Sequence, residues 1–359
     1  MANMIETLLN RHLHALRPYE SARRLFSGGQ DWLNANESPY ANTYDLDAST
    51  FNRYPDCQPE AVINGYANYA GVKKEQVITT RGADEGIELL IRTFCTPGED
   101  NILICPPTYG MYAISAETCN VGIKSVPLKA DFSLDVNAIC QQDDVNLVFI
   151  CSPNNPTGTL VDADDIRQIL THFRDKAIVV VDEAYIEFAS DVGWAREIDN
   201  YPNLVVLRTL SKAFALAGIR CGFTLANENI IAFLMKVIAP YPVPAPVAQI
   251  ASQALSSRGI ELVQSQVAQL NQQRASLASA IEENAELEII GSANANFILF
   301  RCEQKDALMQ YLVENGMLIR DQSKQPGLSN CLRATVGNDA QQKRLIDLIT
   351  TFFTDRRAA

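Results

Sequence analysis

Histidine and tryptophan are rare in this chain, with three and two copies among 359 residues. Neither the histidines nor the nine cysteines form a cluster with zinc-ligand spacing, and no Cys-x-x-Cys pair occurs. We therefore predict no metal site of that kind. The odd number and scattered positions of the cysteines favour reduced, mostly buried thiols in a reducing cytoplasm.

Long apolar runs and an excess of positive charge are also missing. No uninterrupted apolar run reaches the roughly 18 residues that a membrane span needs. The first twenty residues contain Glu6, Arg11 and Arg17, which a signal peptide core would not tolerate. The net charge of −12 argues against a nucleic-acid partner. We expect a cytoplasmic protein with no membrane partner, in which an anionic substrate would need a local cluster of arginines.

Short apolar runs alternate with helical patterns from about residue 56 onwards. This alternation is typical of an α/β fold with a mostly parallel sheet, here of seven strands flanked by helices. Ligands of such sheets bind beyond the carboxyl ends of the strands. The predicted helices are residues 59–69, 82–94 and 162–173. The predicted strands are residues 77–80, 101–105, 122–127, 147–151, 177–182, 204–208 and 219–225.

The proline-rich residues 240–246 mark a change of organisation. A long helix at 248–284 is expected after them, and then a second, smaller α/β domain. Its predicted elements are strands at 288–290, 297–300 and 331–335 and helices at 305–315 and 339–354. We predict a polar N-terminal arm with one short helix (3–14) over residues 1–49, a large domain over 50–246 and a small domain over 247–359.

Polar residues follow three of the predicted strands. Lys212 lies near the hydroxyls of Thr209 and Ser211, and Arg220 follows eight residues later. A lysine in a loop is ordinarily solvated, but this one could form a Schiff base with an aldehyde cofactor whose phosphate the neighbours hold. Asp182 could pair with a protonated pyridine nitrogen, although a helix cap explains it equally well.

Further candidates have an ordinary structural interpretation beside the functional one. Asn155 lies in a turn, Tyr185 could reach the oxygen of the same ring, and Tyr109 could stack on that ring or belong to the core. The helix start at residues 82–85 could hold a phosphate or be a simple connection. Arg320 and Arg333 could anchor an acidic group or point to solvent.

Three motifs occur together in a characteristic order: N-N-P-T-G at 154–158, D-E-A-Y at 182–185 and T-L-S-K-A-F-A-L-A-G-I-R-C-G at 209–222. This combination resembles the fold-type I pyridoxal-phosphate aminotransferases over essentially the whole chain. Residues 33–37 and 81–85 are most similar to the histidinol-phosphate branch of that family. Ser38-Pro39 and Phe223 depart from its usual residues.

The resemblance implies a role for each matching residue. Lys212 would form the Schiff base with pyridoxal 5'-phosphate, and Asp182 would pair with the pyridine nitrogen. Asn155 and Tyr185 would bind the ring oxygen, and Tyr109 would stack on the ring. The cofactor phosphate would be held by Ala83, Asp84, Thr209, Ser211 and Arg220, and by Tyr54 from the partner subunit of an obligate homodimer.

The resemblance also implies the substrates. Arg333 would bind the carboxylate of glutamate or 2-oxoglutarate, and Arg333, Arg320 and Tyr19 would bind the phosphate of histidinol phosphate. The implied activity is a transaminase of histidine biosynthesis. Alternatives on this scaffold are a threonine-phosphate decarboxylase and a broad aromatic-amino-acid aminotransferase. A non-catalytic pyridoxal-phosphate sensor from a transcription regulator is disfavoured by the acidic charge and the short arm.

Overall fold

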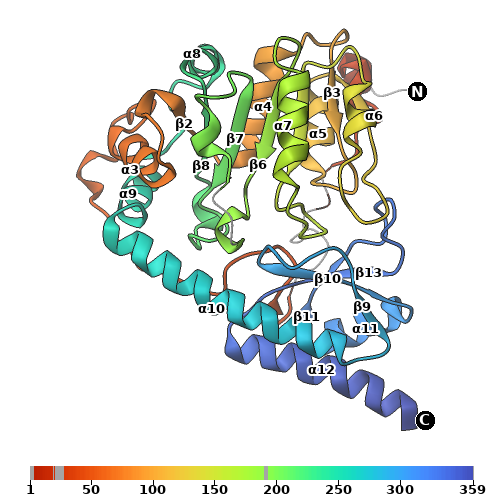
Figure 1. The fold of residues 1–359 in the computed structure, drawn as a ribbon. Coiled ribbons are helices and arrows are strands. Elements are labelled where there is room, and N and C mark those ends of the chain that lie inside the picture. The colour runs from red at the N-terminus through yellow and green to blue at the C-terminus, as the bar shows by residue number, and fades with distance from the viewer. Residues whose placement is uncertain (1–3, 19, 21–27, 190–192, 359) are drawn as a thin grey trace.

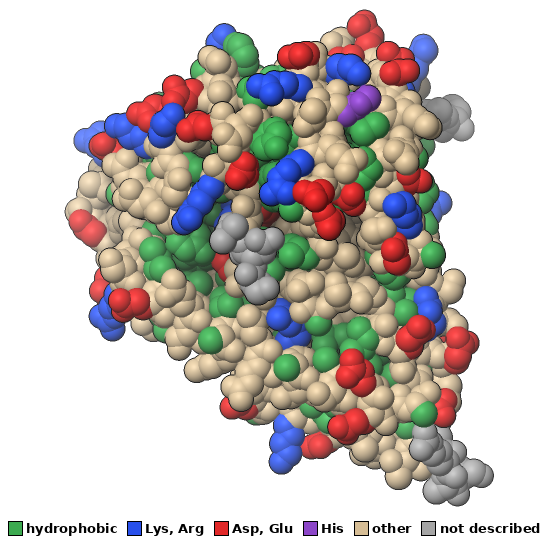
Figure 2. Space-filling view, viewed as in Figure 1, with side chains coloured by type: hydrophobic (Ala, Val, Ile, Leu, Met, Phe, Trp, Pro, Cys, Tyr) green, Lys and Arg blue, Asp and Glu red, His purple; other side chains and the backbone are tan. Residues whose placement is uncertain are grey.

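A seven-stranded sheet forms the larger part of the molecule and a four-stranded sheet lies below it (Figure 1). The computed structural model describes residues 4–18, 20, 28–189 and 193–358. None of the helices in these ranges is long and apolar enough to cross a membrane. On the face in Figure 2, acidic and basic side chains are interspersed over the described surface.

The larger sheet has the strand order β2-β8-β7-β6-β5-β3-β4. Only β8 runs antiparallel to its neighbours, so the predicted mostly parallel seven-stranded sheet is confirmed. The strands are β2 (Val77–Thr80), β3 (Asn101–Ile104), β4 (Gly122–Ser125), β5 (Leu147–Cys151), β6 (Ile178–Asp182), β7 (Leu204–Thr209) and β8 (Gly222–Ala226).

Helices cover both faces of this sheet because the central strands are apolar on both sides. Val179 and Val181 of β6 face one hydrophobic cluster, and Val180 between them faces the other. The first cluster includes α3 (Glu60–Ala70) and α7 (Ala163–His172). The second includes α4 (Ala83–Phe94), α5 (Met111–Thr118) and α8 (Glu228–Val237). A short helix, α6 (Val136–Cys140), precedes β5.

The C-terminal part is a four-stranded antiparallel sheet in the order β12-β13-β10-β9. The predicted strands and helices of this part are all present. They are β9 (Leu287–Ile289), β10 (Phe297–Cys302), β13 (Cys331–Thr335), α11 (Lys305–Glu314) and α12 (Asp339–Ala358). A further short strand, β12 (Arg320–Asp321), was not predicted. In the arm, β1 (Asp31–Trp32) pairs in parallel with β11 (Met317–Leu318).

Three predicted elements differ from the structure. The single helix at 248–284 is two helices, α9 (Ala245–Ala254) and α10 (Ser257–Glu282), because the Ser256 hydroxyl accepts a hydrogen bond from Gly259 N at 3.2 Å and starts a new helix. Strand β8 begins at Gly222 instead of 219, after a 3₁₀ turn. The predicted N-terminal helix is α1 (Met4–Leu8) followed by a separate 3₁₀ turn.

Helices α5 and α8 were not predicted. Strands β5, β6 and β7 end at the same edge of the sheet, between the two parts of the molecule. Asn155, Asp182 and Lys212 lie at or shortly after these strand ends.

Candidate active site

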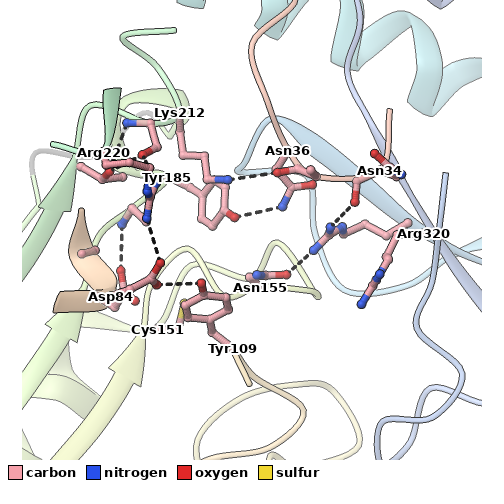
Figure 3. A pocket seen from close by; sticks show the side chains of 17 residues that line it. Asn34, Asn36, Asp84, Tyr109, Cys151, Asn155, Tyr185, Lys212, Arg220 and Arg320 are labelled. Carbon is pink, nitrogen blue, oxygen red and sulfur yellow. Dashed lines mark hydrogen bonds and ion pairs between the residues drawn. The ribbon is translucent and has the colours of Figure 1, made fainter. Parts of the chain in front are cut away.

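A cavity of about 240 Å³ lies at the carboxyl ends of the parallel strands (Figure 3). Both sheets and the arm contribute to it. Of the residues predicted for the site that the structure describes, all line it except Tyr54. The lining residues are Asn34, Ala35, Asn36, Ala83, Asp84, Tyr109, Cys151, Asn155, Asp182, Ala184, Tyr185, Thr209, Ser211, Lys212, Arg220, Arg320 and Arg333.

Lys212 enters the cavity from the loop after β7. Its Nζ donates a hydrogen bond to the Ala35 carbonyl at 3.1 Å and lies 5.6 Å from the centre of the Tyr185 ring. Burial, followed by the nearby Arg333 guanidinium, lowers the Lys212 pKa to about 8. A much larger fraction of this amine is therefore neutral near pH 7 than of an exposed lysine, and a neutral amine is the form that attacks an aldehyde.

Asp182 ends β6 and is only 2 % exposed. Its carboxylate accepts hydrogen bonds from Tyr112 Oη at 2.7 Å and from Ala184 N at 3.1 Å. Burial raises the Asp182 pKa to about 6, and the two hydrogen bonds act in the opposite direction. Above that pH the cavity presents a buried carboxylate, which suits a cationic ring nitrogen. Tyr112 was not predicted, since it lies on the unpredicted helix α5.

An anion cradle lies at the start of α4. Gly82 has a φ of 82°, which favours glycine, and a Cβ at Gly222 would lie 2.5 Å from the Ala83 nitrogen, so β8 approaches the helix start closely. Arg220 Nη2 binds Asp84 at 3.0 Å and its Nη1 lies 3.4 Å from Ser211 Oγ. The helix start, the hydroxyls and the guanidinium together offer donors suited to a phosphate.

Thr209 and Ser211 complete this cradle. The Thr209 hydroxyl donates to Ser211 Oγ at 2.9 Å and accepts from the Ser211 amide at 3.1 Å. Asp84 also accepts a hydrogen bond from Tyr109 Oη at 2.8 Å, which places the Tyr109 ring at the cavity wall. The hydroxyls and the ring are thus held in place at the cavity wall by hydrogen bonds to their neighbours.

Two further arginines, Arg320 and Arg333, line the cavity, and Arg320 lies on the side opposite Arg220 (Figure 3). Arg333 Nη1 donates to Asn155 Oδ1 at 2.5 Å, and its Nη2 donates to the Asn34 carbonyl at 3.1 Å. Arg320 Nη2 donates to the Glu20 carbonyl at 2.5 Å. Its Nη1 is buried and has no hydrogen-bond partner within the described ranges. A buried guanidinium nitrogen of this kind suits an anionic ligand.

The arm supplies cavity residues to which the sequence analysis assigned no role. Asn36 Nδ2 donates to Tyr185 Oη at 2.9 Å, and the Asn36 amide donates to Thr335 Oγ1 at 2.9 Å. Asn36 has a φ of 54°, a conformation that asparagine tolerates better than most residues. No local pattern in residues 33–37 indicates that they reach Tyr185. Only their similarity to the family motif marks them in the sequence.

One predicted site residue, Tyr54, lies outside the cavity. Tyr54 is 82 % exposed, and its ring stacks on Tyr241 with the centroids 4.5 Å apart. It does not line the cavity of its own chain. Tyr19 lies outside the described residues.

Comparison with known proteins identifies the family of the chain. The family model "Aminotransferase class I and II" matches residues 29–349. The chain is 64 % identical to the histidinol-phosphate aminotransferase of Pseudoalteromonas atlantica, with 98 % of this chain and 96 % of the relative covered. It is 53 % identical to that of Serratia proteamaculans, with 96 % of each chain covered.

Among solved structures, the histidinol-phosphate aminotransferase of Sinorhizobium meliloti in complex with pyridoxal-5'-phosphate superposes with a TM-score of 0.82. It is 19 % identical and covers 96 % of this chain and 98 % of its own, so it supports the fold. The family match spans most of the chain, including both sheets and every cavity residue. The chain therefore belongs to the class I and II aminotransferases.

Proposed function

We propose that this chain is a histidinol-phosphate aminotransferase of histidine biosynthesis. It would convert L-histidinol phosphate and 2-oxoglutarate to 3-(imidazol-4-yl)-2-oxopropyl phosphate and L-glutamate, with pyridoxal 5'-phosphate as cofactor. The observation that carries the proposal is the full-length identity of 64 % to a histidinol-phosphate aminotransferase. The cavity adds an amine, a carboxylate and an anion cradle in one place, which fits this cofactor.

Pyridoxal phosphate supplies an aldehyde that condenses with amines and a pyridinium ring that accepts electrons. Lys212 would hold the cofactor covalently and, once displaced by the substrate amine, would carry the proton away from the substrate Cα. Its lowered pKa keeps a share of the amine ready to accept that proton near neutral pH. Asp182 would keep the ring nitrogen protonated. Asn155 and Tyr185 would bind the ring oxygen.

The arginines account for the two substrates. Arg333 would bind the carboxylate of glutamate or 2-oxoglutarate, and Arg333 and Arg320 together would bind the phosphate of histidinol phosphate, with Tyr19 from the arm. Both substrates end in an anion, so the same guanidinium groups serve each half of the reaction. Since the chain carries a net charge of −12, this local positive charge is what would attract them.

We further propose a cytoplasmic homodimer. Tyr54 is highly exposed and lies outside its own cavity, so it would reach the cofactor phosphate of the partner subunit. Each subunit would consist of an arm (1–49), a large domain (50–246) and a small domain (247–359). Sedimentation of the wild-type protein and of Tyr54→Ala measures whether this residue contributes to the dimer. If Tyr54→Ala is still a dimer, its contribution is to cofactor affinity alone.

Turnover of the purified, cofactor-loaded protein tests the function. We expect glutamate to form from histidinol phosphate and 2-oxoglutarate, in parallel assays with phosphothreonine and phenylalanine as competing substrates. Release of CO₂ from phosphothreonine without transamination of histidinol phosphate would replace this proposal with a decarboxylase. Faster turnover of phenylalanine than of histidinol phosphate would replace it with a broad aromatic aminotransferase.

A further inference from the structure

The carboxylate of Asp182 is held by a side chain that none of the site motifs contains. Tyr112 on α5 donates its phenolic proton to Oδ2 at 2.7 Å, and the Ala184 amide donates to Oδ1 at 3.1 Å. Each carboxylate oxygen can accept about two hydrogen bonds. Both oxygens of Asp182 therefore keep a position for a donor that enters the cavity.

The hydroxyl of Tyr112 has a fixed position because its ring is enclosed. Tyr112 is 0 % exposed. Its ring stacks on Phe149 of β5, with centroids 4.8 Å apart and an angle of 17°. The Tyr109 ring meets it edge-on at 5.7 Å. Tyr112 thus packs directly against Tyr109, the residue that we propose to stack on the cofactor, while it holds Asp182.

Apart from the hydrogen bonds from Tyr112 and the Ala184 amide, the surroundings of Asp182 oppose its ionised form. Burial acts most strongly, and the acidic side chains of Asp84 on α4 and Glu183 beside it act in the same direction. The other titratable neighbours, Cys151 of β5 and Tyr185, are neutral at pH 7 because burial raises the pKa of each. Tyr112 is the side chain that favours the carboxylate most strongly.

We propose that Tyr112 is a positioning residue that keeps the Asp182 carboxylate ionised and oriented toward the pyridine nitrogen of the bound cofactor. This inference rests on the cofactor of the proposed function and not on its substrate. Tyr112 would act on the cofactor only through Asp182 and Tyr109, which it contacts directly.

A matched pair of substitutions isolates the hydroxyl. Tyr112→Phe removes the donor to Asp182 and keeps the ring. Tyr66→Phe is the control, because Tyr66 is also 0 % exposed and its ring also stacks on a phenylalanine, Phe223. The Tyr66 hydroxyl has no hydrogen-bond partner in the part of the chain that the structure describes.

The readout is the dissociation constant of the apoenzyme for two ligands, measured by fluorescence titration. The first ligand is pyridoxal phosphate, and the second is its carbocyclic analogue with C–H in place of the ring nitrogen. We expect Tyr112→Phe to weaken pyridoxal phosphate binding by about tenfold to a hundredfold, as loss of a hydrogen bond to a charged group does. Binding of the analogue is expected to change by less than about threefold, and Tyr66→Phe to change neither.

The pH dependence and a double substitution sharpen the test. In Tyr112→Phe, the pH below which pyridoxal phosphate binding weakens should rise by about one unit. In an Asp182→Asn background, Tyr112→Phe should have almost no further effect on affinity. Equal weakening of both ligands, or an undiminished effect in the Asp182→Asn background, would overturn the proposal and leave Tyr112 a packing residue.

The proposed function is tested separately, because these titrations contain no amino-group donor. Absence of turnover with histidinol phosphate would contradict the proposed function and leave this inference standing. If Tyr112→Phe weakened the binding of both ligands equally, this inference would be contradicted and the proposed function would still stand.

Discussion

The two walls of the cavity are built in different ways. The wall that we propose to hold the cofactor, the cofactor wall, consists of Asp182, Lys212, Arg220 and the start of α4. These residues lie next to the ends of neighbouring strands of one sheet: Asp182 ends β6, Lys212 follows β7, Arg220 precedes β8 and α4 follows β2. The substrate wall consists of Arg320, Arg333 and residues 34–36. It joins segments far apart in sequence, as the bond from Arg333 to the Asn34 carbonyl spans 299 positions.

The geometry of the two walls therefore depends on different parts of the fold. Strand pairing fixes the cofactor wall, so its geometry follows from the fold of the larger sheet. The substrate wall depends on how the arm and the four-stranded sheet dock against the larger sheet. We expect substitutions in the cofactor wall to change the chemical step or cofactor affinity. Those in the substrate wall should change the Michaelis constants of both substrates while cofactor affinity stays the same.

Loss of Lys212 gives the largest expected effect. Lys212→Ala removes the group that would bind the cofactor and move the substrate proton, so kcat should fall by about a thousandfold or more. Glutamate formation from histidinol phosphate measures it. Lys236→Ala, on the exposed side of α8, is the control and should retain full activity. Full turnover by Lys212→Ala would show that the reaction does not depend on the proposed cofactor wall.

Arg333→Lys tests whether the two walls are separable. The substitution keeps the charge and loses the planar fork, so KM for histidinol phosphate and for 2-oxoglutarate should rise about tenfold to a hundredfold. The pyridoxal phosphate dissociation constant should stay within about twofold. Arg301→Lys, outside the cavity, serves as the control. A parallel loss of cofactor affinity would show that the walls act as one unit.

Asn36 connects the walls, and its substitution should have a smaller effect. Asn36→Ala removes the donor to Tyr185, so kcat should fall by about twofold to tenfold. It also places alanine at a φ of 54°, which should lower Tm by a few degrees. Asn36→Gly should show the same loss of kcat with a smaller loss of Tm. Equal Tm losses would mean that the side-chain contacts, and not the backbone conformation, hold the arm.

The smallest expected effect concerns the stability of the apoprotein. The pKa of Asp182 is raised by burial to about 6, so the folded state binds this proton more tightly than the unfolded state. Stability from this group is present below the ordinary aspartate pKa and is lost as pH rises through about 6. Asp182→Asn apoprotein should therefore melt about 2–5 °C higher than wild type at pH 7.5, and the difference should shrink toward pH 4. If the difference in Tm between Asp182→Asn and wild type were the same at pH 4 as at pH 7.5, the effect would come from packing and not from ionisation of Asp182.

Much of the cofactor wall could be predicted from the sequence. The apolar runs of β5, β6 and β7 identify buried strands. Asp182 ends β6, and Lys212 lies in the loop just after β7. Parallel strands end at one edge, so local patterns were enough to bring these residues together. The start of β8 was misplaced because Arg220 adopts a φ of 55°, which no apolar pattern reveals.

The remaining features of the site depend on contacts between segments that are far apart in the sequence. Tyr112 was missed because α5 has no clear apolar periodicity in M-Y-A-I-S-A-E-T, although Tyr112 itself is fully buried. The bond between Asn36 and Tyr185 spans 149 positions, and only folding reveals it. Arg333 is ambiguous as a strand residue in the sequence. In the structure it lines the cavity, and its guanidinium packs 5.2 Å from the centre of the Phe297 ring.

The central claim is that one cavity holds pyridoxal phosphate on Lys212 opposite arginines that bind histidinol phosphate. Titration of the cofactor-loaded protein with histidinol phosphate, in the absence of 2-oxoglutarate, tests it most directly. We predict that the absorbance of the bound cofactor shifts from its aldehyde form to its amine form with one equivalent of substrate, and that 2-oxoglutarate reverses the shift. An absorbance that histidinol phosphate leaves unchanged would contradict the account.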